Sequence, residues 1–322
     1  MDNKIDITVI IPVYNAALLI NRCLDAVFAQ TKLYQLEVII VDDGSTDNSL
    51  EIIKGRKEKS IILLQQQNTG PASARNKGIA IAKGEFITFI DADDYWLPEF
   101  IEKTISVLKN NTSLVAVSVM QKHIIKGKGV IIVPQYYTNL SQAIILDDFF
   151  NFWADQNHIC TGSVMMRTEI VKKTNGQRTE LRITEDLEFW GYLATFGKWA
   201  FLPEVLFVSD GTAVTNKIGW LNKNKLRWAS APTVETWERR IINNISKPLS
   251  QGYLHARGRI AKNLCYSMIL SQRTQIAYKE IKKYEKDFPH DIISRVLRIG
   301  VKNRFFWRIV SSLLIYREFH KK

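Results

Sequence analysis

The chain has 322 residues, of which 46% are hydrophobic and 24% are charged. This composition excludes a disordered chain, a collagen and a coiled-coil array, and the length indicates one large domain with additions or two domains. The formal net charge of +12 is unevenly distributed. Residues 1–216 hold 21 Lys and Arg against 25 Asp and Glu, whereas residues 217–322 hold 23 against 7. We therefore expect an anionic partner for the last third: a membrane, a nucleic acid or a phosphorylated ligand.

The cysteines and the hydropathy indicate where the protein works. Cys23, Cys160 and Cys265 are far apart and odd in number, so they form neither a disulfide framework nor a Cys-x-x-Cys metal signature. A reducing, cytosolic compartment fits this pattern. The polar first six residues indicate that no signal peptide is present. No apolar run approaches the roughly 18 residues of a transmembrane helix, so we expect any membrane contact to be peripheral.

Strands and helices alternate through the first hundred residues. Apolar, β-branched runs predict the strands, and apolar residues at helical spacing predict the helices between them. This alternation predicts an α/β fold, a mostly parallel sheet with helices on both faces. The expected strands are 8–13, 37–41, 61–64 and 85–90, and the expected helices, caps included, are 17–30, 45–57 and 71–83.

Mixed elements follow, and the last third is helical and basic. Expected helices cover 97–109 and 185–195, and expected strands cover 114–121, 130–133, 163–166 and 201–208, the last interrupted at Pro203. From residue 217 onward the apolar spacing is helical. We therefore divide the chain into a domain of residues 1–216, with halves 1–97 and 98–216, and a helical basic region of residues 217–322.

Polar and turn-forming residues follow all four early strands. They are Pro12, Tyr14 and Asn15, then 42–45, 68–71 and 91–94. Ligands of open parallel sheets bind beyond the carboxyl ends of the strands, so these loops predict one common binding edge. Asp, Asn and Gly also form ordinary turns, which explains any single loop but not four in succession.

The segment Asp91-Ala92-Asp93 predicts a metal site at the end of the fourth strand. In an extended chain residues 91 and 93 point to the same side, and two carboxylates there form a hard oxygen site for Mg²⁺ or Mn²⁺. Such an ion neutralises a diphosphate and so helps it to leave. An Asp-x-Asp segment also occurs in many surface turns, but the apolar strand before this one strengthens the prediction of a metal.

Residues 5–97 resemble the nucleotide-sugar-binding half of family-2 glycosyltransferases with the GT-A fold. The resemblance rests on TVIIPVYN (Thr8–Asn15), VDDGSTD (Val41–Asp47), NTGPASARNKG (Asn68–Gly78) and FIDADD (Phe89–Asp94), in this order. A fifth match is TEDLEFWGYLA from Thr184, and coverage extends to about residue 210. The resemblance implies a Rossmann-like GT-A sheet in residues 1–216 and an enzyme of the bacterial surface-polysaccharide type.

The resemblance implies a role for each matching residue toward a UDP-sugar donor. The residues implied for the nucleotide pocket are Pro12, Tyr14 and Asn15, with Asp43 as the acceptor of the uracil N3–H. Asn68 and Arg75 are implied to hold the base and the ribose or phosphate region. Asp91 is implied to contact the ribose or the sugar, with Ala92 in the same donor-binding segment.

The metal ligand implied by the resemblance is Asp93, with Asp91 beside it. Family members often place a third ligand, a His, after the last core strand, but the segment 207–212 contains no His. We predict Asp210 as the oxygen ligand that replaces it. Alternatively the diphosphate and water complete the metal shell, and Asp210 only forms a turn with Gly211.

Asp186 is implied as the general base that deprotonates the acceptor hydroxyl, with Glu185 beside it binding acceptor or donor sugar. One positioned carboxylate suffices for that proton transfer. The leaving nucleoside diphosphate needs charge neutralisation, which the metal and Arg75 would supply. The implied reaction is a single in-line displacement that inverts the anomeric carbon.

Basic residues alternate with apolar ones at helical spacing in residues 291–316. The basic positions are Arg295, Arg298, Lys302, Arg304 and Arg308. Together with Trp307 and two Phe residues, this pattern is typical of a helix that lies in a membrane interface, and Gly300 is expected to bend or divide it. The alternative is a C-terminal helix that packs its apolar stripe on the catalytic domain.

A membrane surface bound through residues 289–322 suits a lipid-linked saccharide acceptor. We therefore predict a cytoplasmic protein that is peripheral on the inner face of the cell membrane. Nucleic-acid binding is the alternative from another class, but the sequence has no zinc ligands, no aromatic RNA-binding strand and no repeat, so we expect no nucleic-acid partner. A nucleotide-sugar-binding module without activity is a third interpretation, against which Asp93 and Asp186 argue.

Overall fold

The computed structural model describes residues 4–30, 33–125, 129–134, 142–211 and 224–320. The chain divides into two compact units. The first consists of Met1–Phe149, Gln156–Thr179 and Phe189–Val214, and the second of Phe150–Asp155, Glu180–Glu188 and Thr215–Lys322. The domain boundary that we predict at residue 216 lies outside the described residues and stays a prediction.

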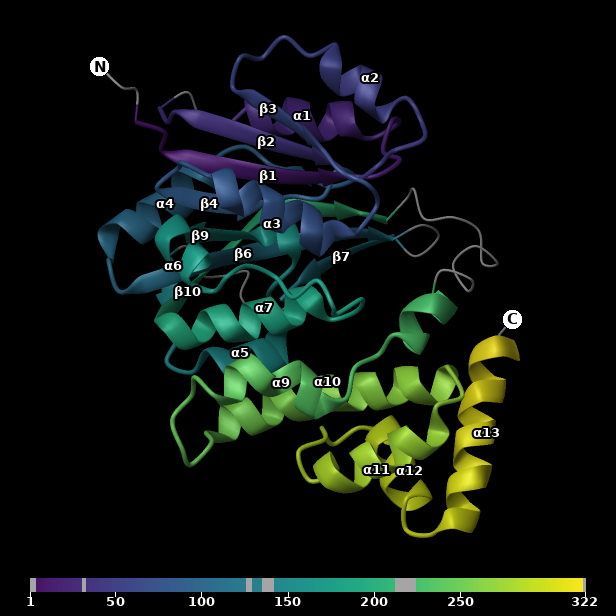
Figure 1. The fold of residues 1–322 in the computed structure, drawn as a ribbon. Helices are drawn as coiled ribbons and strands as arrows, with labels where there is room; N and C mark the ends of the chain where they lie inside the picture. Colours follow the sequence, from purple (N-terminus) through teal and green to yellow (C-terminus); the bar gives the residue numbers. More distant parts are fainter. Residues whose placement is uncertain (1–3, 31–32, 126–128, 135–141, 212–223, 321–322) are drawn as a thin grey trace. The chain divides into compact units, whose positions relative to one another are not determined.

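The first unit is built on a mixed sheet whose N-terminal part is parallel (Figure 1). Strands β1 (Ile7–Val13), β2 (Leu36–Asp42), β3 (Ile61–Gln65) and β4 (Phe86–Phe89) lie in the order β3-β2-β1-β4. Each neighbouring pair is parallel. The predicted parallel α/β core is thus confirmed, and the carboxyl ends of these four strands meet at one edge of the sheet.

Helices α1 (Ile20–Phe28) and α3 (Pro71–Ile81) cover opposite faces of β1. Because side chains alternate along a strand, Val9 and Ile11 share one core cluster with Cys23 and Leu24 of α1, whereas Ile10 points to α3. A Cβ atom at Gly78 of α3 would lie 2.7 Å from the Ile10 Cγ2, so only glycine allows this close packing. The short helix α2 (Ser49–Lys54) contacts α1.

The sheet continues in the order β9 (Val164–Arg167), β6 (Leu114–Ile125), β10 (Lys198–Asp210) and β5 (Tyr95–Trp96). Strand β9 is antiparallel to both β4 and β6, β10 is parallel to β6, and β5 is antiparallel to β10. Strand β10 runs through Pro203 with shifts in its register, so the interruption that we predicted there is an irregularity inside one strand.

Short strands and helices complete this part of the chain. Strand β7 (Gly129–Val133) pairs with β6, and β8 (Ile144–Ile145) pairs with β10. The helices are α4 (Phe100–Asn110), α5 (Phe149–Gln156), α6 (Thr168–Lys173) and α7 (Glu185–Leu193), with 3₁₀ turns at Thr161–Ser163 and Ala194–Phe196. Helix α7 begins in the second unit and ends in the first.

Between residues 224 and 320 the second unit is mainly helical, as predicted. The helices are α9 (Val234–Ile242), α10 (Gln251–Leu270), α11 (Thr274–Tyr284), α12 (Ile292–Gly300) and α13 (Arg304–His320), and residues 224–229 are also helical. Thr233, Ser250 and Asp291 cap α9, α10 and α12 by accepting a hydrogen bond from the backbone N–H three residues on. Among the described helices, none is both long enough and apolar enough to cross a membrane.

A buried carboxylate holds the helices of the second unit together. Glu238 of α9 accepts hydrogen bonds from the Tyr253 hydroxyl (2.8 Å) and the Tyr284 hydroxyl (3.2 Å), and its Oε2 lies 3.4 Å from the Arg257 Nη1. Arg257 also pairs with Asp287 at 2.6 Å. Burial and the Glu238 charge raise the pKa of the Tyr253 hydroxyl, which therefore remains a donor.

Candidate active site

The loops after β1 and β2 are joined by hydrogen bonds at the carboxyl edge of the sheet. Pro12 is buried within β1, whereas Tyr14 and Asn15 are exposed directly after it. The Asn15 backbone N–H donates to the Ser45 Oγ at 3.1 Å, and the Thr46 backbone N–H donates to the Asn15 Oδ1 at 2.8 Å. Asn15 has a positive φ of 51°, a conformation that Asn tolerates better than most residues. The loops after β1 and β2, the first two that we predicted to bind ligand, are thus held together by these hydrogen bonds.

Asp43 fixes the loop between β3 and α3. Its carboxylate accepts hydrogen bonds from the backbone N–H groups of Thr69 and Gly70, both at 2.9 Å, and from the Gln66 Nε2 at 2.8 Å. Asp43 is buried, while Asn68 lies exposed on the same loop. The predicted contact of Asp43 with a uracil stays a prediction, and the structure adds a role in ordering this loop.

Arg75 links helix α3 to the end of β4. Its guanidinium is buried; Nη2 lies 2.5 Å from the Asp91 Oδ1, and Nη1 donates to the Gln177 Oε1 at 3.2 Å. The fold places Arg75 and Asp91 at one edge of the sheet, as expected from the sequence. Gln177 was not predicted, because it lies in a loop after α6 where the sequence offers no motif.

Residues 91–94 form a tight acidic turn. The Asp94 backbone N–H donates to the Asp91 carbonyl at 3.0 Å, so the expectation that 91 and 93 alternate along an extended chain is wrong. Asp91 is half-buried, Ala92 is buried and Asp93 is exposed. Burial, with the neighbouring charges of Asp91 and Asp93, raises the pKa of Asp94 to about 8. Asp94 accepts a hydrogen bond from the Asp210 backbone N–H at 3.0 Å and so joins this turn to β10.

Arg22 of α1 connects the acidic turn to Asp210. One of its guanidinium nitrogens pairs with the Asp210 carboxylate, and another donates to the Asp93 carbonyl at 2.6 Å. The guanidinium also lies 4.7 Å from the centre of the Tyr95 ring. Sequence reasoning missed Arg22, because a basic residue between apolar helical positions has the pattern of an ordinary solvent-facing side chain.

The predicted metal site can be tested against these contacts. Within the described part of the chain, no three His, Cys, Asp or Glu side chains are grouped to hold a metal ion. Asp91 and Asp93 offer two carboxylates, and Mg²⁺ is commonly held by one or two carboxylates together with substrate phosphates. The chemistry of this donor pair therefore fits a divalent ion, although Asp91 also pairs with Arg75 through Oδ1, and the Asp210 carboxylate is engaged with Arg22.

Glu185 and Asp186 belong to the second unit and begin helix α7. Both are partly buried, and the Asp186 Oδ1 accepts a hydrogen bond from the Leu187 backbone N–H at 2.8 Å. Two residues on, the fully buried Glu188 accepts two hydrogen bonds from Arg240 of α9, at 2.8 and 2.5 Å. This paired contact fixes the start of α7, and with it the two carboxylates that the sequence predicts for catalysis.

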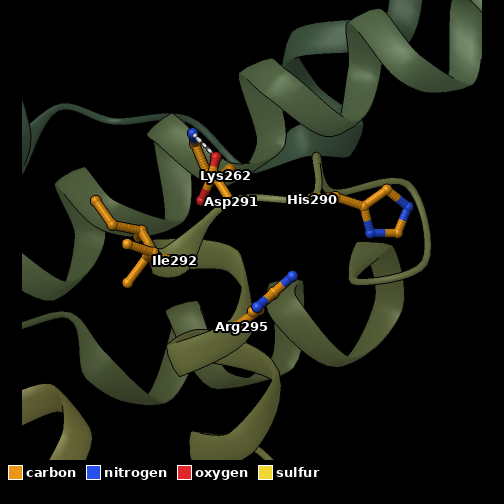
Figure 2. A pocket seen from close by; sticks show the side chains of 6 residues that line it. Lys262, His290, Asp291, Ile292 and Arg295 are labelled. Carbon is orange, nitrogen blue, oxygen red and sulfur yellow. Dashed lines mark hydrogen bonds and ion pairs between the residues drawn. The ribbon is translucent and has the colours of Figure 1, made fainter.

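The second unit also contains an open depression of about 440 Å³ (Figure 2). It is lined by Lys262, His290, Asp291, Ile292, Ile293 and Arg295. Lys262 and Asp291 form an ion pair at 2.7 Å, and Asp291 also caps α12. None of the residues implied for donor binding or catalysis lines this depression, and its central ion pair has a structural role.

Comparison with known proteins connects this geometry to one family. The family model described as glycosyl transferase family 2 matches residues 8–174, slightly more than half of the chain. A glycosyltransferase, GlyA, from Streptococcus pneumoniae is 27% identical over 267 residues, which are 78% of this chain and 35% of GlyA. A poly(ribitol-phosphate) beta-glucosyltransferase from Bacillus spizizenii is 39% identical over 129 residues, 38% of this chain and 20% of that protein. The chain thus spans well under half the length of these relatives.

The fold comparison agrees with the sequence comparison. The crystal structure of S. aureus TarS 1-349 in complex with UDP-GlcNAc is similar with a TM-score of 0.66 and 17% identity, over 98% of this chain and 92% of that one. A mannosyltransferase from Pyrobaculum calidifontis in complex with GDP-Man and Mn²⁺ is similar with a TM-score of 0.58 and 18% identity, over 97% of this chain and 86% of that one. The predicted GT-A fold is confirmed, and the chain belongs to glycosyl transferase family 2.

Proposed function

We propose that the protein is an inverting, metal-dependent glycosyltransferase that moves a sugar from a UDP-sugar to a saccharide acceptor. The observation that carries this proposal is the pair of the buried Arg75 with the half-buried Asp91, in the acidic turn 91–94 at the carboxyl edge of a parallel sheet. These residues lie inside the segment that matches the family model. The complex of TarS with UDP-GlcNAc supports the choice of a uridine donor.

The donor nucleotide is assigned to the loops after β1, β2 and β3. Tyr14 and Asn15 are exposed at the edge where the base and ribose would lie, next to Pro12. Asp43 would accept the uracil N3–H while it continues to order the loop that carries Asn68. Arg75 would place positive charge near the diphosphate, and Asp91, which orients the Arg75 guanidinium, would contact the ribose or the sugar next to Ala92.

A Mn²⁺ or Mg²⁺ ion is assigned to Asp93 and Asp91, with Asp210 as the third protein ligand if the Arg22 pair opens. When bound, the ion would offset charge on the diphosphate leaving group. The mannosyltransferase complex with GDP-Man and Mn²⁺ supports a divalent cofactor. Arg22 and Arg75 already supply two cations next to these carboxylates, so the protein's own residues share that task.

The catalytic base is assigned to Asp186. Its carboxylate would take the proton of the acceptor hydroxyl as that oxygen bonds to the anomeric carbon, and the electron pair of the broken carbon–oxygen bond would leave with UDP. Attack from the side opposite the leaving group inverts the anomeric configuration. Glu185, next to Asp186 in the first turn of α7, would bind the acceptor or the donor sugar.

We assign the acceptor to the class of lipid-linked saccharides, and the pathway to bacterial surface polysaccharide or lipooligosaccharide. The reaction would then take place on the inner face of the cell membrane, with the protein bound peripherally from the cytoplasm. The surplus of 23 Lys and Arg over 7 Asp and Glu in residues 217–322 supports a negatively charged surface as the partner of that region.

The test is release of UDP from a panel of UDP-sugars, with Mn²⁺ and with EDTA. We expect release with one or a few of the sugars, dependent on metal. Binding of UDP without release from any sugar, even with saccharide acceptors present, would instead indicate an inactive binding module. Salt-sensitive gel shifts without UDP binding would indicate a nucleic-acid-binding protein.

A further inference from the structure

Helix α13 has apolar side chains on two opposite faces. Trp307 and Leu314 are buried on one face, together with the small polar Ser311, and the Trp307 ring packs against Tyr278 of α11 at 5.7 Å between ring centres. On the other side lie five exposed apolar or aromatic residues, which we call the outer stripe. The outer stripe consists of Phe305, Phe306, Ile309, Leu313 and Tyr316, with exposed fractions between 43% and 70%.

The outer stripe is a continuous band. At 3.6 residues per turn its five side chains fall within an arc of about 100°, opposite the buried face of the helix. From Phe305 to Tyr316 the band is about 17 Å long at 1.5 Å per residue. A packed C-terminal helix, the alternative that the sequence left open, explains only the Trp307 side. An apolar band of this size on a protein surface is typical of an interaction site.

Positive charge surrounds the outer stripe. Arg308 and Arg317 lie exposed on α13 on either side of it, and Arg304 lies exposed at the N-terminal end of the helix. Residues 289–322 contain eight Lys and Arg but only two acidic residues, Asp291 and Glu318. Asp291 is paired with Lys262, and Glu318 accepts a hydrogen bond from the Tyr266 hydroxyl at 3.2 Å, so neither carboxylate offsets these arginines fully.

Helix α12 repeats this arrangement on a smaller scale. Ile292 and Ile299 are exposed, Arg295 lies between them on the same face, and Leu297 packs inward. The helices α12 and α13 pack closely at Gly300, where an added Cβ atom would lie 3.1 Å from the Val310 side chain. Gly300 thus ends α12 and divides the basic region into two helices, one of the two outcomes that the sequence predicts.

We propose that the outer stripe of α13 is the face that binds an anionic lipid bilayer, with the stripe among the acyl chains and the flanking arginines at the phosphate headgroups. Association with a second copy of the chain would bring two strongly positive surfaces together, which like-charge repulsion opposes. A nucleic acid would satisfy the arginines but would leave Ile309 and Leu313 without apolar partners. An anionic membrane satisfies both the charges and the apolar side chains.

This proposal corrects one part of the interfacial pattern predicted from the sequence. The sequence pattern counted Trp307 among the interfacial aromatic residues, but Trp307 is 3% exposed and belongs to the packed face. The aromatic residues of the outer stripe are Phe305, Phe306 and Tyr316 instead. We therefore expect α13 to lie on the bilayer with Phe305, Phe306 and Tyr316 toward the lipid and Trp307 toward the protein.

Co-flotation of the full chain with vesicles tests the proposal. We expect binding to vesicles rich in phosphatidylglycerol and little binding to pure phosphatidylcholine. Replacing Phe305, Ile309 and Leu313 together by Ser should lower the vesicle affinity at least about tenfold. The matched control is L18S with L226S, which removes exposed leucines elsewhere, and it should bind like the wild type.

A second set of variants tests the charges. R304Q, R308Q and R317Q together should weaken binding and reduce its dependence on salt, whereas K54Q, K83Q and K198Q, all at exposed positions of the first unit, should have little effect. All of these sites are exposed, so circular dichroism should show unchanged folding. Because flotation needs no sugar transfer, its outcome is independent of the proposed reaction.

Four outcomes would overturn the proposal. The first is wild-type binding to anionic vesicles no stronger than to neutral ones, and the second is a triple serine variant that binds like the wild type. The third is a stable dimer in sedimentation that does not bind vesicles and that the triple serine substitution dissociates. The fourth is a protein that does not bind vesicles but shifts a nucleic acid in a gel, with the shift lost in the triple serine variant. That result would indicate that the outer stripe binds nucleic acid.

Discussion

The two units of the protein bury their charges in different ways. In the first unit, Asp91 and Arg22 belong to ion pairs at the sheet edge, yet their side chains keep exposed fractions of 37% and 38%. In the second unit, the side chains of Glu188 and Glu238 are 0% and 6% exposed and meet arginines inside a helical core. A buried ion pair therefore marks a candidate binding site only where one member remains accessible to a ligand.

The ion pairs of the first unit and those of the second unit also lie on different kinds of structural element. The carboxylates of the first unit lie on loops and strand ends, where the backbone already leaves an open edge, and they meet arginines of α1 and α3. The buried carboxylates of the second unit, Glu188 and Glu238, lie within helices, where they join neighbouring helices. Removing a charge from the first network should mainly change ligand binding, and removing one from the second should mainly change stability.

The largest effect is expected from Asp186→Asn. If Asp186 is the base, sugar transfer should fall about 10²- to 10⁴-fold, because the amide cannot accept the acceptor proton. UDP affinity, measured by titration calorimetry, should be nearly unchanged. Asp147→Asn, at an exposed position, is the matched control and should transfer at the wild-type rate. Full activity of the Asp186 variant would refute the assignment of the base.

Glu238→Ala should break the network of the second unit. It removes a buried carboxylate that accepts hydrogen bonds from two tyrosines and pairs with the partly buried Arg257, so the free energy of unfolding should fall by about 3 kcal/mol. Glu235→Ala, on the same helix, removes only an exposed pair with Lys283 and should cost less than about 1 kcal/mol. Thermal or urea unfolding measures both variants. A loss of UDP affinity in correctly folded Glu238→Ala protein would contradict the purely structural role.

Arg75→Gln should weaken donor binding about 10- to 100-fold, because it removes the buried cation assigned to the diphosphate and leaves Asp91 beside two other carboxylates. Calorimetry with UDP provides the measurement. Lys83→Gln, an exposed position that follows the same helix, should bind UDP as the wild type does. If the Arg75→Gln variant is less stable but binds UDP normally, the Arg75–Asp91 pair has a structural role, like the ion pairs of the second unit.

Asp93→Ala should have the smallest effect, about a tenfold loss of UDP affinity in the presence of Mn²⁺. In EDTA the variant and the wild type should bind UDP equally, because the loss acts only through the metal. Calorimetry in both buffers separates the two conditions. Equal affinities with and without metal in the wild type would remove Asp93 from the metal site.

The sequence predicted the elements whose signal is local. The four strand-end loops and the alternation of strands and helices come from apolar runs and turn residues, and the structure brings those loops to one edge. Arg22 and Gln177 were missed because their importance depends on neighbours far away in the sequence: Arg22 meets Asp210, and Gln177 meets Arg75. No periodic pattern encodes such pairs.

One local prediction failed, and one alternative stayed open, for reasons of context. The Asp91-Ala92-Asp93 segment follows a strand, which favoured an extended interpretation, but the chain turns there so that Asp94 can join β10. Trp307 fits an interfacial pattern by residue type, yet only the packing of α13 decides which of its two apolar faces is covered. A helical pattern specifies faces, and tertiary contacts choose between them.

The hydrogen bonds of Asp43 have a consequence for how the nucleotide pocket forms. Three donors from residues 66–70 converge on one buried carboxylate, so that the loop carrying Asn68 is already in place before any nucleotide arrives. Preorganisation of this kind spares a ligand the entropic cost of ordering the loop. In the proposed function Asp43 would also contact the base, so a substitution there should disturb the shape of the loop together with base recognition.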